Sequence, residues 1–262
     1  MFTIQKLVQP EDIAAAYKTL IERKNNSILG GCAFLRMGSK SIGTAIDLSK
    51  LDLNYIREQE DYIEIGAMTN LREFETHYLL KEYFGGVLGK AVSNIIGVQF
   101  RNIVTVGATV FSKYGFSDVI TALLALDTEV ELYNGGRINL EDFLNMSYEK
   151  DILTRIFIKK NGRKAIYKDL RNAVSDYPIL NVTVSSLKND WIIVVGARPR
   201  RAAIAKEASK ELSKENLTEE DIDKAADMAS KELAFGTNMR GSEKYRKAMC
   251  KVLVKRAIME VL

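Results

Sequence analysis

The sequence predicts an α+β fold, and three features of its hydrophobic pattern lead to this prediction. In the first half of the chain, strand-like apolar segments alternate with amphipathic helical ones. A second region contains strand-like segments in which apolar and polar residues alternate, as they do in an antiparallel sheet with one buried face. The chain from about Ala202 to Leu262 has a helical pattern. Alternating strands and helices favour an α/β or α+β core, and the separate strands and helices that follow favour a second unit.

The first region opens with an amphipathic helix. Residues 11–24 place apolar groups on one helix face, with acidic residues at the start and basic residues at the end. Ile28 and Leu29 then form a short apolar strand that runs into the turn Gly30-Gly31. Further strands are expected at 45–48, 62–66 and 129–133, and further helices at 71–77 and 117–126.

The second region predicts an antiparallel meander followed by helices. Its strand-like segments cover residues 152–158, 163–168, 179–187 and 191–196. In the helical tail, Thr218 is a suitable N-cap because acidic residues follow it in the first turn. Gly236 and Gly241 interrupt the tail before a last helix that contains Tyr245.

Composition and charge narrow the function. The chain has 47% apolar and 27% charged residues and a net charge of +4, which is typical of a globular protein and lacks a concentrated basic patch for nucleic acid. Cys32 and Cys250 are far apart and His77 is the single histidine, so neither a disulfide framework nor a metal site is predicted. No apolar run reaches the roughly 20 residues of a membrane span, and the N-terminus lacks a signal pattern. We therefore expect a cytoplasmic protein that binds no membrane.

Two turns of small residues are candidates for ligand binding. The first contains Gly30 and Gly31, and the second contains Gly107. Glycine permits backbone conformations closed to other residues and brings N–H groups close to a ligand, so such a turn can hold a diphosphate. Neither turn fits the GxGxxG or GxxxxGK[ST] pattern, which disfavours a Rossmann domain and a P-loop. A turn that only reverses the chain remains the alternative for each.

The order of motifs along the chain resembles the FAD-binding (medium) subunit of the xanthine dehydrogenase and carbon monoxide dehydrogenase family of molybdenum hydroxylases. The similar segments are 28–35, 45–49, 65–71, 99–107 and 117–130, followed by 140–144 and 152–156. The segment 99–107 is similar to the first part of the family's Q-x-R-N-x-x-T-x-G-G-N turn, and 240–246 matches the R-G-S-x-x-Y-R signature of the C-terminal domain of carbon monoxide dehydrogenase flavoproteins. The resemblance covers essentially the whole chain.

The resemblance implies a specific architecture within the α+β class. It is a p-cresol-methylhydroxylase-type FAD-binding domain of two α/β subdomains, followed by a C-terminal domain with an antiparallel sheet and helices. We expect the FAD-binding domain at residues 1–162, with subdomains at about 1–58 and 59–162. The C-terminal domain is expected at residues 163–262.

The resemblance also implies a set of FAD-binding residues. The first turn would lie along the diphosphate, and the second would hold it from the other side. Asp118 would bond the ribityl or phosphate region, Ile152 would contact the isoalloxazine ring, and Lys168 would lie near its pyrimidine edge, where a cation stabilises the charge of reduced flavin. The residues of the two turns in this prediction are Leu29, Gly30, Gly31, Cys32, Ala33, Phe34, Thr105, Gly107, Ala108 and Thr109.

The function implied is electron relay without substrate chemistry in this chain. FAD would receive electrons from [2Fe-2S] clusters of an iron–sulfur subunit, which take them from a molybdopterin-binding subunit, and pass them to NAD+ or another acceptor. No catalytic residue and no metal ligand are expected here. Tyr114 and Phe116 would either cover the flavin or a nicotinamide, or cap a core.

Two alternatives to the electron relay stay open, and the first follows from departures from the family pattern. Gly107 is followed by Ala108 and Thr109 where Gly-Asn is usual, and Cys32 stands where threonine is common. A non-catalytic scaffold that has lost its flavin is one alternative. A stand-alone FAD oxidase is the other, and it would need an acid–base cluster that the sequence does not offer around His77.

Overall fold

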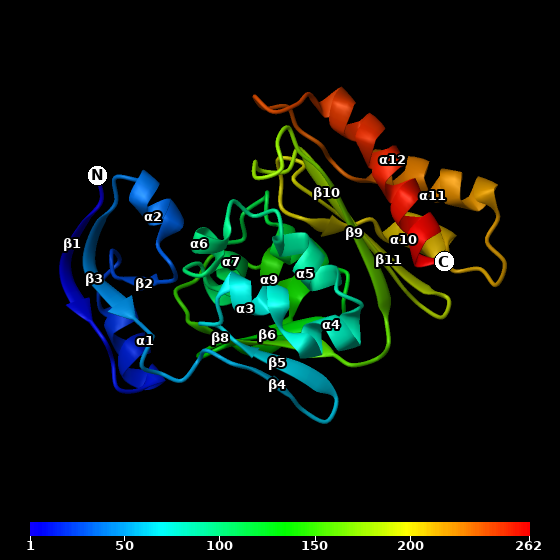
Figure 1. Cartoon of the computed structure of the whole chain (residues 1–262). Helices are drawn as coiled ribbons and strands as arrows, with labels where there is room; N and C mark the ends of the chain where they lie inside the picture. The colour runs from blue at the N-terminus through cyan, green and yellow to red at the C-terminus, as the bar shows by residue number, and fades with distance from the viewer.

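A computed structural model describes all residues from Met1 to Leu262. It contains three sheets in chain order, each with its own helices (Figure 1). The mixed α/β first part and the C-terminal antiparallel sheet with helices confirm the predicted fold class. No helix is both long enough and apolar enough to cross a membrane.

The first sheet has three parallel strands in the order β1-β3-β2, formed by Thr3–Val8, Ser41–Asp47 and Ser27–Leu29. Helix α1 (Ile13–Glu22) buries Ala16 and Leu20, and its N-cap Asp12 accepts from the Ala15 N–H at 2.7 Å. The short helix α2 (Ala33–Met37) follows the Gly30-Gly31 turn. Strand β1 was not predicted, because its side chains are mostly exposed and its pattern carries little hydrophobic signal.

The second sheet has five antiparallel strands in the order β4-β5-β8-β6-β7. They are formed by Ile56–Glu58, Tyr62–Gly66, Leu153–Lys159, Thr128–Leu132 and Gly136–Asn139. The helices of this unit are α3 (Leu71–Thr76), α4 (Tyr78–Phe84), α5 (Val87–Val92), α6 (Val98–Arg101), α7 (Val106–Phe111), α8 (Asp118–Leu124) and α9 (Leu140–Asn145). Much of the largest hydrophobic core lies between these helices and the sheet.

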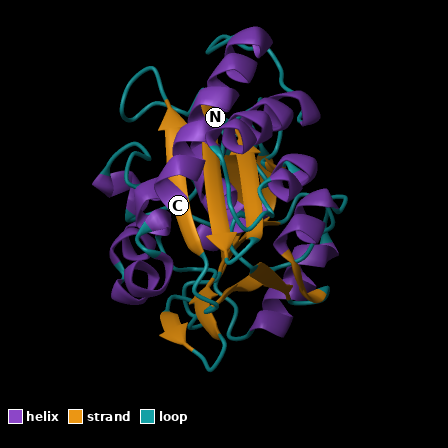
Figure 2. Ribbon diagram, turned by 90° about the vertical axis from the view of Figure 1, so that its right-hand side faces the viewer, coloured by secondary structure: helices purple, strands orange, loops and turns teal.

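The third sheet has four antiparallel strands in the order β12-β11-β10-β9. They are formed by Ala203–Ile204, Asp190–Gly196, Leu180–Leu187 and Lys164–Leu170. Its helices are α10 (Lys206–Glu211), α11 (Glu219–Glu232) and α12 (Glu243–Val261). The N-cap Thr218 is confirmed, with a reciprocal capping box to Asp221. Figure 2, in which this side of the molecule faces the viewer, shows the helices lying across the strands.

Both faces of the third sheet are covered, which places it against the centre of the molecule. Val182 and Val184 belong to the core shared with α10, α11 and α12. Tyr167 and Val194 belong instead to the core of the second unit. Polar contacts join the same two units, because Ser185 donates to the Ala125 carbonyl at 2.5 Å. Strand β9 is therefore held between the α8 region and the C-terminal helices.

One part of the meander prediction was wrong. The segment 152–158 does not join the C-terminal strands, because β8 pairs with β5 and β6 in the second sheet. Its apolar pattern predicts a buried strand, but the pattern carries no information on which sheet the strand enters. The meander proper consists of β9, β10 and β11.

Candidate FAD site

A cavity of about 410 Å³ lies where the three units meet, a size within the range of small-molecule pockets. Its walls come from residues 27–40 of the first unit, 71–118 of the second and 171–177 of the C-terminal unit. Of the predicted site residues, those lining the cavity are Gly30, Cys32, Ala33, Phe34, Ala108, Thr109 and Asp118. Leu29, Gly31, Thr105 and Gly107 are in the same two turns without lining it.

The first turn lines this cavity and contains a row of unpaired backbone donors. None of the backbone N–H groups from Gly31 to Leu35 donates to a protein acceptor, and the Gly30 N–H faces the Cys32 sulfur. Gly31 and Cys32 have φ values of 76° and 58°, in the left-handed region, and the right-handed helix α2 begins at Ala33. At such a change from left-handed to right-handed backbone, consecutive N–H groups converge as they do in an anion-binding nest. A Cβ on Gly31 would lie 2.5 Å from the Ile103 carbonyl oxygen, so only glycine fits there.

The second turn is different, because its backbone donors are already used. The N–H groups of Val106 and Gly107 donate to the carbonyls of Thr69 and Ala67, at 2.8 and 2.9 Å. Thr105 is the N-cap of α7, and its Oγ1 accepts from the Ala108 N–H at 3.3 Å. The residues just before this turn pack against Gly31 of the first turn, and Ala108 and Thr109 line the cavity.

The departures from the family pattern are accommodated within the second turn. A Cβ on Gly30 would overlap the Ala108 methyl, so the missing side chain of Gly30 makes room for that methyl. The Thr109 hydroxyl donates to the Thr105 carbonyl at 2.8 Å. The side chains of Ala108 and Thr109 are therefore accommodated by contacts within the protein, and neither uses a backbone donor of the first turn.

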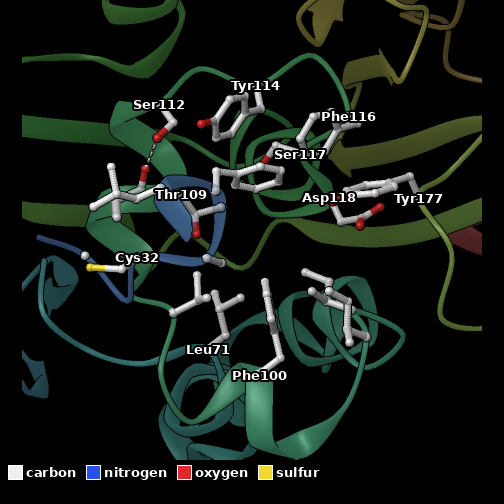
Figure 3. A pocket seen from close by; sticks show the side chains of 18 of the residues that line it. Cys32, Leu71, Phe100, Thr109, Ser112, Tyr114, Phe116, Ser117, Asp118 and Tyr177 are labelled. Atoms are coloured by element: carbon white, nitrogen blue, oxygen red, sulfur yellow. Dashed lines mark hydrogen bonds between the residues drawn. The ribbon is translucent and has the colours of Figure 1, made fainter. Parts of the chain in front are cut away.

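Apolar and aromatic side chains form the walls between the two ends of the cavity. Leu71 and Phe100 lie on one side, and Tyr114 and Phe116 lie on the other (Figure 3). The rings of Tyr114 and Phe116 stack with centroids 5.1 Å apart, and Phe116 meets Tyr177 edge-on at 4.7 Å. These walls suit a flat aromatic ring system.

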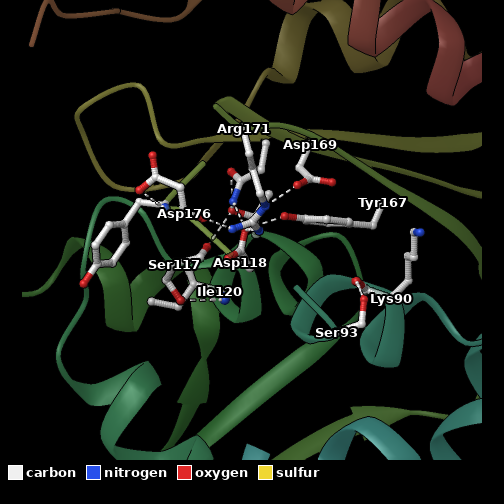
Figure 4. A network of polar contacts seen from close by, with 12 residues as sticks. Lys90, Ser93, Ser117, Asp118, Ile120, Tyr167, Asp169, Arg171 and Asp176 are labelled. Carbon is white, nitrogen blue, oxygen red and sulfur yellow. Dashed lines mark hydrogen bonds and ion pairs between the residues drawn. The ribbon is translucent and has the colours of Figure 1, made fainter. Parts of the chain in front are cut away.

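Asp118 lies at the far end of the cavity from Cys32 (Figure 3). Its side chain is 5% exposed and Oδ1 accepts from the Tyr167 hydroxyl and, at 2.9 Å, from Asn181 Nδ2. Arg171 Nη2 lies 2.8 Å from the same oxygen (Figure 4). Burial raises the pKa of Asp118, and the Arg171 charge opposes this effect. The carboxylate therefore has protein partners from the C-terminal sheet.

Ile152 and Lys168 lie outside the cavity lining. Ile152 is 2% exposed in a small core with residues of the first unit. Lys168 forms an ion pair with Glu260 of α12. Successive side chains of a strand point to opposite faces, and Tyr167 points toward Asp118, so Lys168 must point toward the C-terminal helices. Their contacts with flavin remain predictions from the resemblance.

The C-terminal unit contributes residues that sequence reasoning missed, namely Arg171, Ser175, Asp176 and Tyr177. They belong to the loop between β9 and β10. The available signal was the segment 171–177, which begins with a cation and ends with an acidic residue followed by an aromatic one.

The R-G-S-x-x-Y-R segment holds this loop in place. Arg240 lies 3.2 Å from Asp176 and above the ring of Tyr177, 5.0 Å from its centroid. Arg246 is 1% exposed and donates to the Ile179 carbonyl at 2.8 Å. The segment thus acts on the site by positioning the loop that carries Tyr177.

The residues present fit FAD. Unpaired N–H groups at the Gly30–Leu35 turn suit a diphosphate, because a cluster of oriented donors binds anions without a cationic side chain. Burial raises the pKa of the Cys32 thiol, which keeps it neutral beside such an anion. The aromatic walls and the Arg171 guanidinium beside Asp118 suit the isoalloxazine ring of FAD.

Comparisons with known proteins identify the family of this chain. The model of the FAD binding domain in molybdopterin dehydrogenase matches residues 2–160, and that of the CO dehydrogenase flavoprotein C-terminal domain matches residues 165–261. The chain is 25% identical to the glyceraldehyde dehydrogenase medium chain of Sulfolobus acidocaldarius, over 97% of each chain. It is 30% identical to the nicotinate dehydrogenase FAD-subunit of Eubacterium barkeri, over 47% of this chain and 46% of the relative.

Solved structures show the same fold over the full length. A chain of Cu,Mo-CO dehydrogenase superposes with a TM-score of 0.89 at 22% identity, covering 100% of this chain and 98% of the other. A chain of quinoline 2-oxidoreductase from Pseudomonas putida 86 gives 0.88 at 18% identity, covering 99% and 96%. The chain therefore belongs to the FAD-binding subunits of molybdenum hydroxylase-type dehydrogenases, a family of oxidoreductases.

Proposed function

We propose that this chain is the electron relay of a multi-subunit molybdenum hydroxylase. In this proposal, bound FAD collects electrons from [2Fe-2S] clusters of an iron–sulfur subunit, which takes them from a molybdopterin-binding subunit, and reduces NAD+ or another acceptor. The observation that carries the proposal is the row of unpaired N–H donors from Gly31 to Leu35, in a turn that lines a cavity shared by all three units. Relatives named as a medium chain and an FAD-subunit support a role within a larger assembly.

The residues of this chain have clear tasks in that role. The Gly30–Leu35 turn binds the diphosphate, and the helix α7 turn supports it. Phe100, Tyr114 and Phe116 exclude water from the ring system because they form apolar walls around it. The chemistry of electron transfer is supplied by the cofactor, and the protein supplies binding, orientation and electrostatics.

An absorbance spectrum tests the proposal. We expect the purified full chain, alone or with partner subunits expressed from neighbouring genes, to show flavin absorbance between about 350 and 500 nm that is retained on a desalting column. Addition of the assembled partners and their substrate should bleach this absorbance under anaerobic conditions. Absence of flavin, even with FAD added to the assembled protein, would contradict the proposal and favour the non-catalytic scaffold.

The stand-alone oxidase receives less support from the site. His77 does not line the cavity, and the titratable groups nearest to Asp118 are engaged with one another. Turnover of small organic substrates with oxygen by the isolated chain would favour that alternative.

A further inference from the structure

Arg171 lines the cavity, and its guanidinium is paired with protein groups except for one hydrogen of Nη2. Its side chain is 6% exposed. Nε donates to Asp169, and Nη1 donates to the Asp176 carbonyl at 2.5 Å (Figure 4). Nη2 lies 2.8 Å from an Asp118 oxygen, and this ion pair uses at most one of the two hydrogens on Nη2. No protein acceptor takes the remaining hydrogen, so an acceptor atom of a bound ligand would complete the hydrogen bonds of the guanidinium.

The guanidinium is held rigidly from two sides. Asp169 and the Asp176 carbonyl fix Nε and Nη1, and Asp118 supplies a buried negative charge next to Nη2. Tyr167 and Asn181 in turn hold Asp118. A donor fixed in this way does not have to be reoriented when an acceptor arrives, which is the condition for effective electrostatic stabilisation.

The position of Arg171 in the cavity determines which part of a bound ligand its side chain can contact. The diphosphate donors lie at the Gly30–Leu35 turn, and Figure 3 shows Cys32 of that turn at the opposite end of the cavity from Asp118 and Tyr177. Arg171 contacts Asp118 and therefore belongs to the Tyr177 end. Aromatic rings surround that end, so the ligand group expected there is flat and carries acceptor atoms at its edge.

We infer that Arg171 donates from Nη2 to the pyrimidine edge of the flavin ring and thereby raises the reduction potential of the bound cofactor. This inference rests on the proposed FAD binding. A hydrogen bond to an acceptor strengthens as that acceptor gains negative charge, so reduced FAD gains more from the contact than oxidised FAD. Asp118 is then a positioning residue, which acts through Arg171.

The test measures the reduction potential of bound FAD and the affinity for ADP in the full chain. Arg171→Gln leaves Asp118 buried without its cation, so it is made in an Asp118→Asn background and compared with Asp118→Asn alone. We expect the potential to fall by about 30 mV or more, which corresponds to a tenfold weaker preference for reduced FAD in a two-electron couple. Affinity for ADP, which lacks the flavin ring, should stay unchanged.

Three further variants complete the design. Arg171→Lys keeps a positive charge next to Asp118, so the buried carboxylate does not lose its cation. We expect the reduction potential to fall less in this variant than in Arg171→Gln. Lys164→Gln removes an exposed cation from β9, the strand that precedes Arg171, and is the matched control. Lys168→Gln tests the alternative cation on β9, and we expect no shift because its partner is Glu260.

The outcomes separate this inference from the proposed function. An unchanged potential in the Arg171 variants, a shift only in Lys168→Gln, or a loss of ADP affinity in parallel with FAD affinity would overturn it. If a variant folds but retains no FAD, unchanged ADP affinity supports a contact at the ring and reduced ADP affinity contradicts it. Failure of the unaltered chain to bind FAD would instead contradict the proposed function.

Discussion

The two glycine-containing turns look equivalent in sequence but have different tasks in the structure. From Gly31 to Leu35 every backbone N–H lacks a protein partner, whereas the N–H groups of Val106 to Ala108 are all satisfied within the protein. A Cβ on Gly31 would lie 2.5 Å from the Ile103 carbonyl and one on Gly107 would lie 2.5 Å from Ala67. Glycine in the first turn thus serves both the nest and the fit against the second turn, and glycine in the second serves packing.

This difference teaches that donor saturation, more than glycine content, identifies an anion-binding turn. A backbone N–H contributes to ligand binding only if no protein acceptor already uses it. The departures from the family pattern at Ala108 and Thr109 fall in the saturated turn, where backbone contacts with a diphosphate are few. We therefore expect substitutions in the two turns to have effects of very different size.

The largest effect is expected for Gly31→Ala. Position 31 has a left-handed backbone conformation, which is strained for alanine, and the new Cβ would overlap the Ile103 carbonyl oxygen. The backbone must therefore shift, which separates the N–H groups of the nest. Loss of two charge-assisted hydrogen bonds, each worth about 1.5–3 kcal/mol, lowers FAD affinity by about 100-fold or more. Titration of the apoprotein with FAD, followed by flavin fluorescence, measures this loss.

Gly86→Ala is the matched control for Gly31→Ala. Gly86 has a φ of 77°, close to the 76° of Gly31, but a Cβ there would meet nothing within 4 Å. The left-handed conformation alone costs about 1–2 kcal/mol, so stability falls while FAD affinity stays unchanged. Equal losses of FAD affinity in both variants would show that the nest geometry is not what binds FAD.

The double variant Ala108→Gly with Thr109→Asn restores the family pattern in the saturated turn. We expect FAD affinity to change by less than about tenfold, or 1.4 kcal/mol. Stability should fall by about 1 kcal/mol, because glycine replaces alanine in α7 and the methyl contact with Gly30 is lost. If flavin binds only after this change, the scaffold alternative describes the natural chain and our comparison of the turns is wrong.

A smaller effect is expected for Thr105→Val. The change removes the side-chain cap of α7 but keeps the volume of the side chain, which is needed because Thr105 is buried. Loss of such a cap costs about 1 kcal/mol of stability, measurable as a lower midpoint in thermal unfolding. FAD affinity should stay within error of the unaltered chain. A large loss of affinity without a loss of stability would mean that the Thr105 hydroxyl binds the cofactor directly.

Much of the fold could be predicted from the sequence because its signals are local. The helix at Ile13–Glu22, the strand at Tyr62–Gly66 and the N-cap at Thr218 follow from apolar spacing and from capping chemistry. Strand β8 is an example of a feature that local patterns do not predict. Its burial was predictable, but its partners β5 and β6 are distant in sequence, and no local pattern encodes that pairing.

The candidate site divides in the same way. The resemblance led to Gly30, Ala108 and Asp118, which line one cavity. It did not lead to Arg171, which directly follows β9, because the side of this strand that faces the cavity depends on how the third sheet packs against α8. Once Tyr167 is seen to contact Asp118, strand alternation places Lys168 on the opposite face. Knowledge of the packing was needed before the correct face could be chosen.

The smallest effect concerns the pH dependence of the first turn. Burial raises the pKa of the Cys32 thiol, so the neutral form persists to a higher pH than usual. Only at pH values above about 8.5, the ordinary thiol pKa, should thiolate form and repel the diphosphate. FAD affinity is therefore expected to be constant from neutral pH to this value and to fall above it. Cys32→Ser should flatten the fall, whereas a fall at lower pH, or one that persists in Cys32→Ser, would assign the titration to another group.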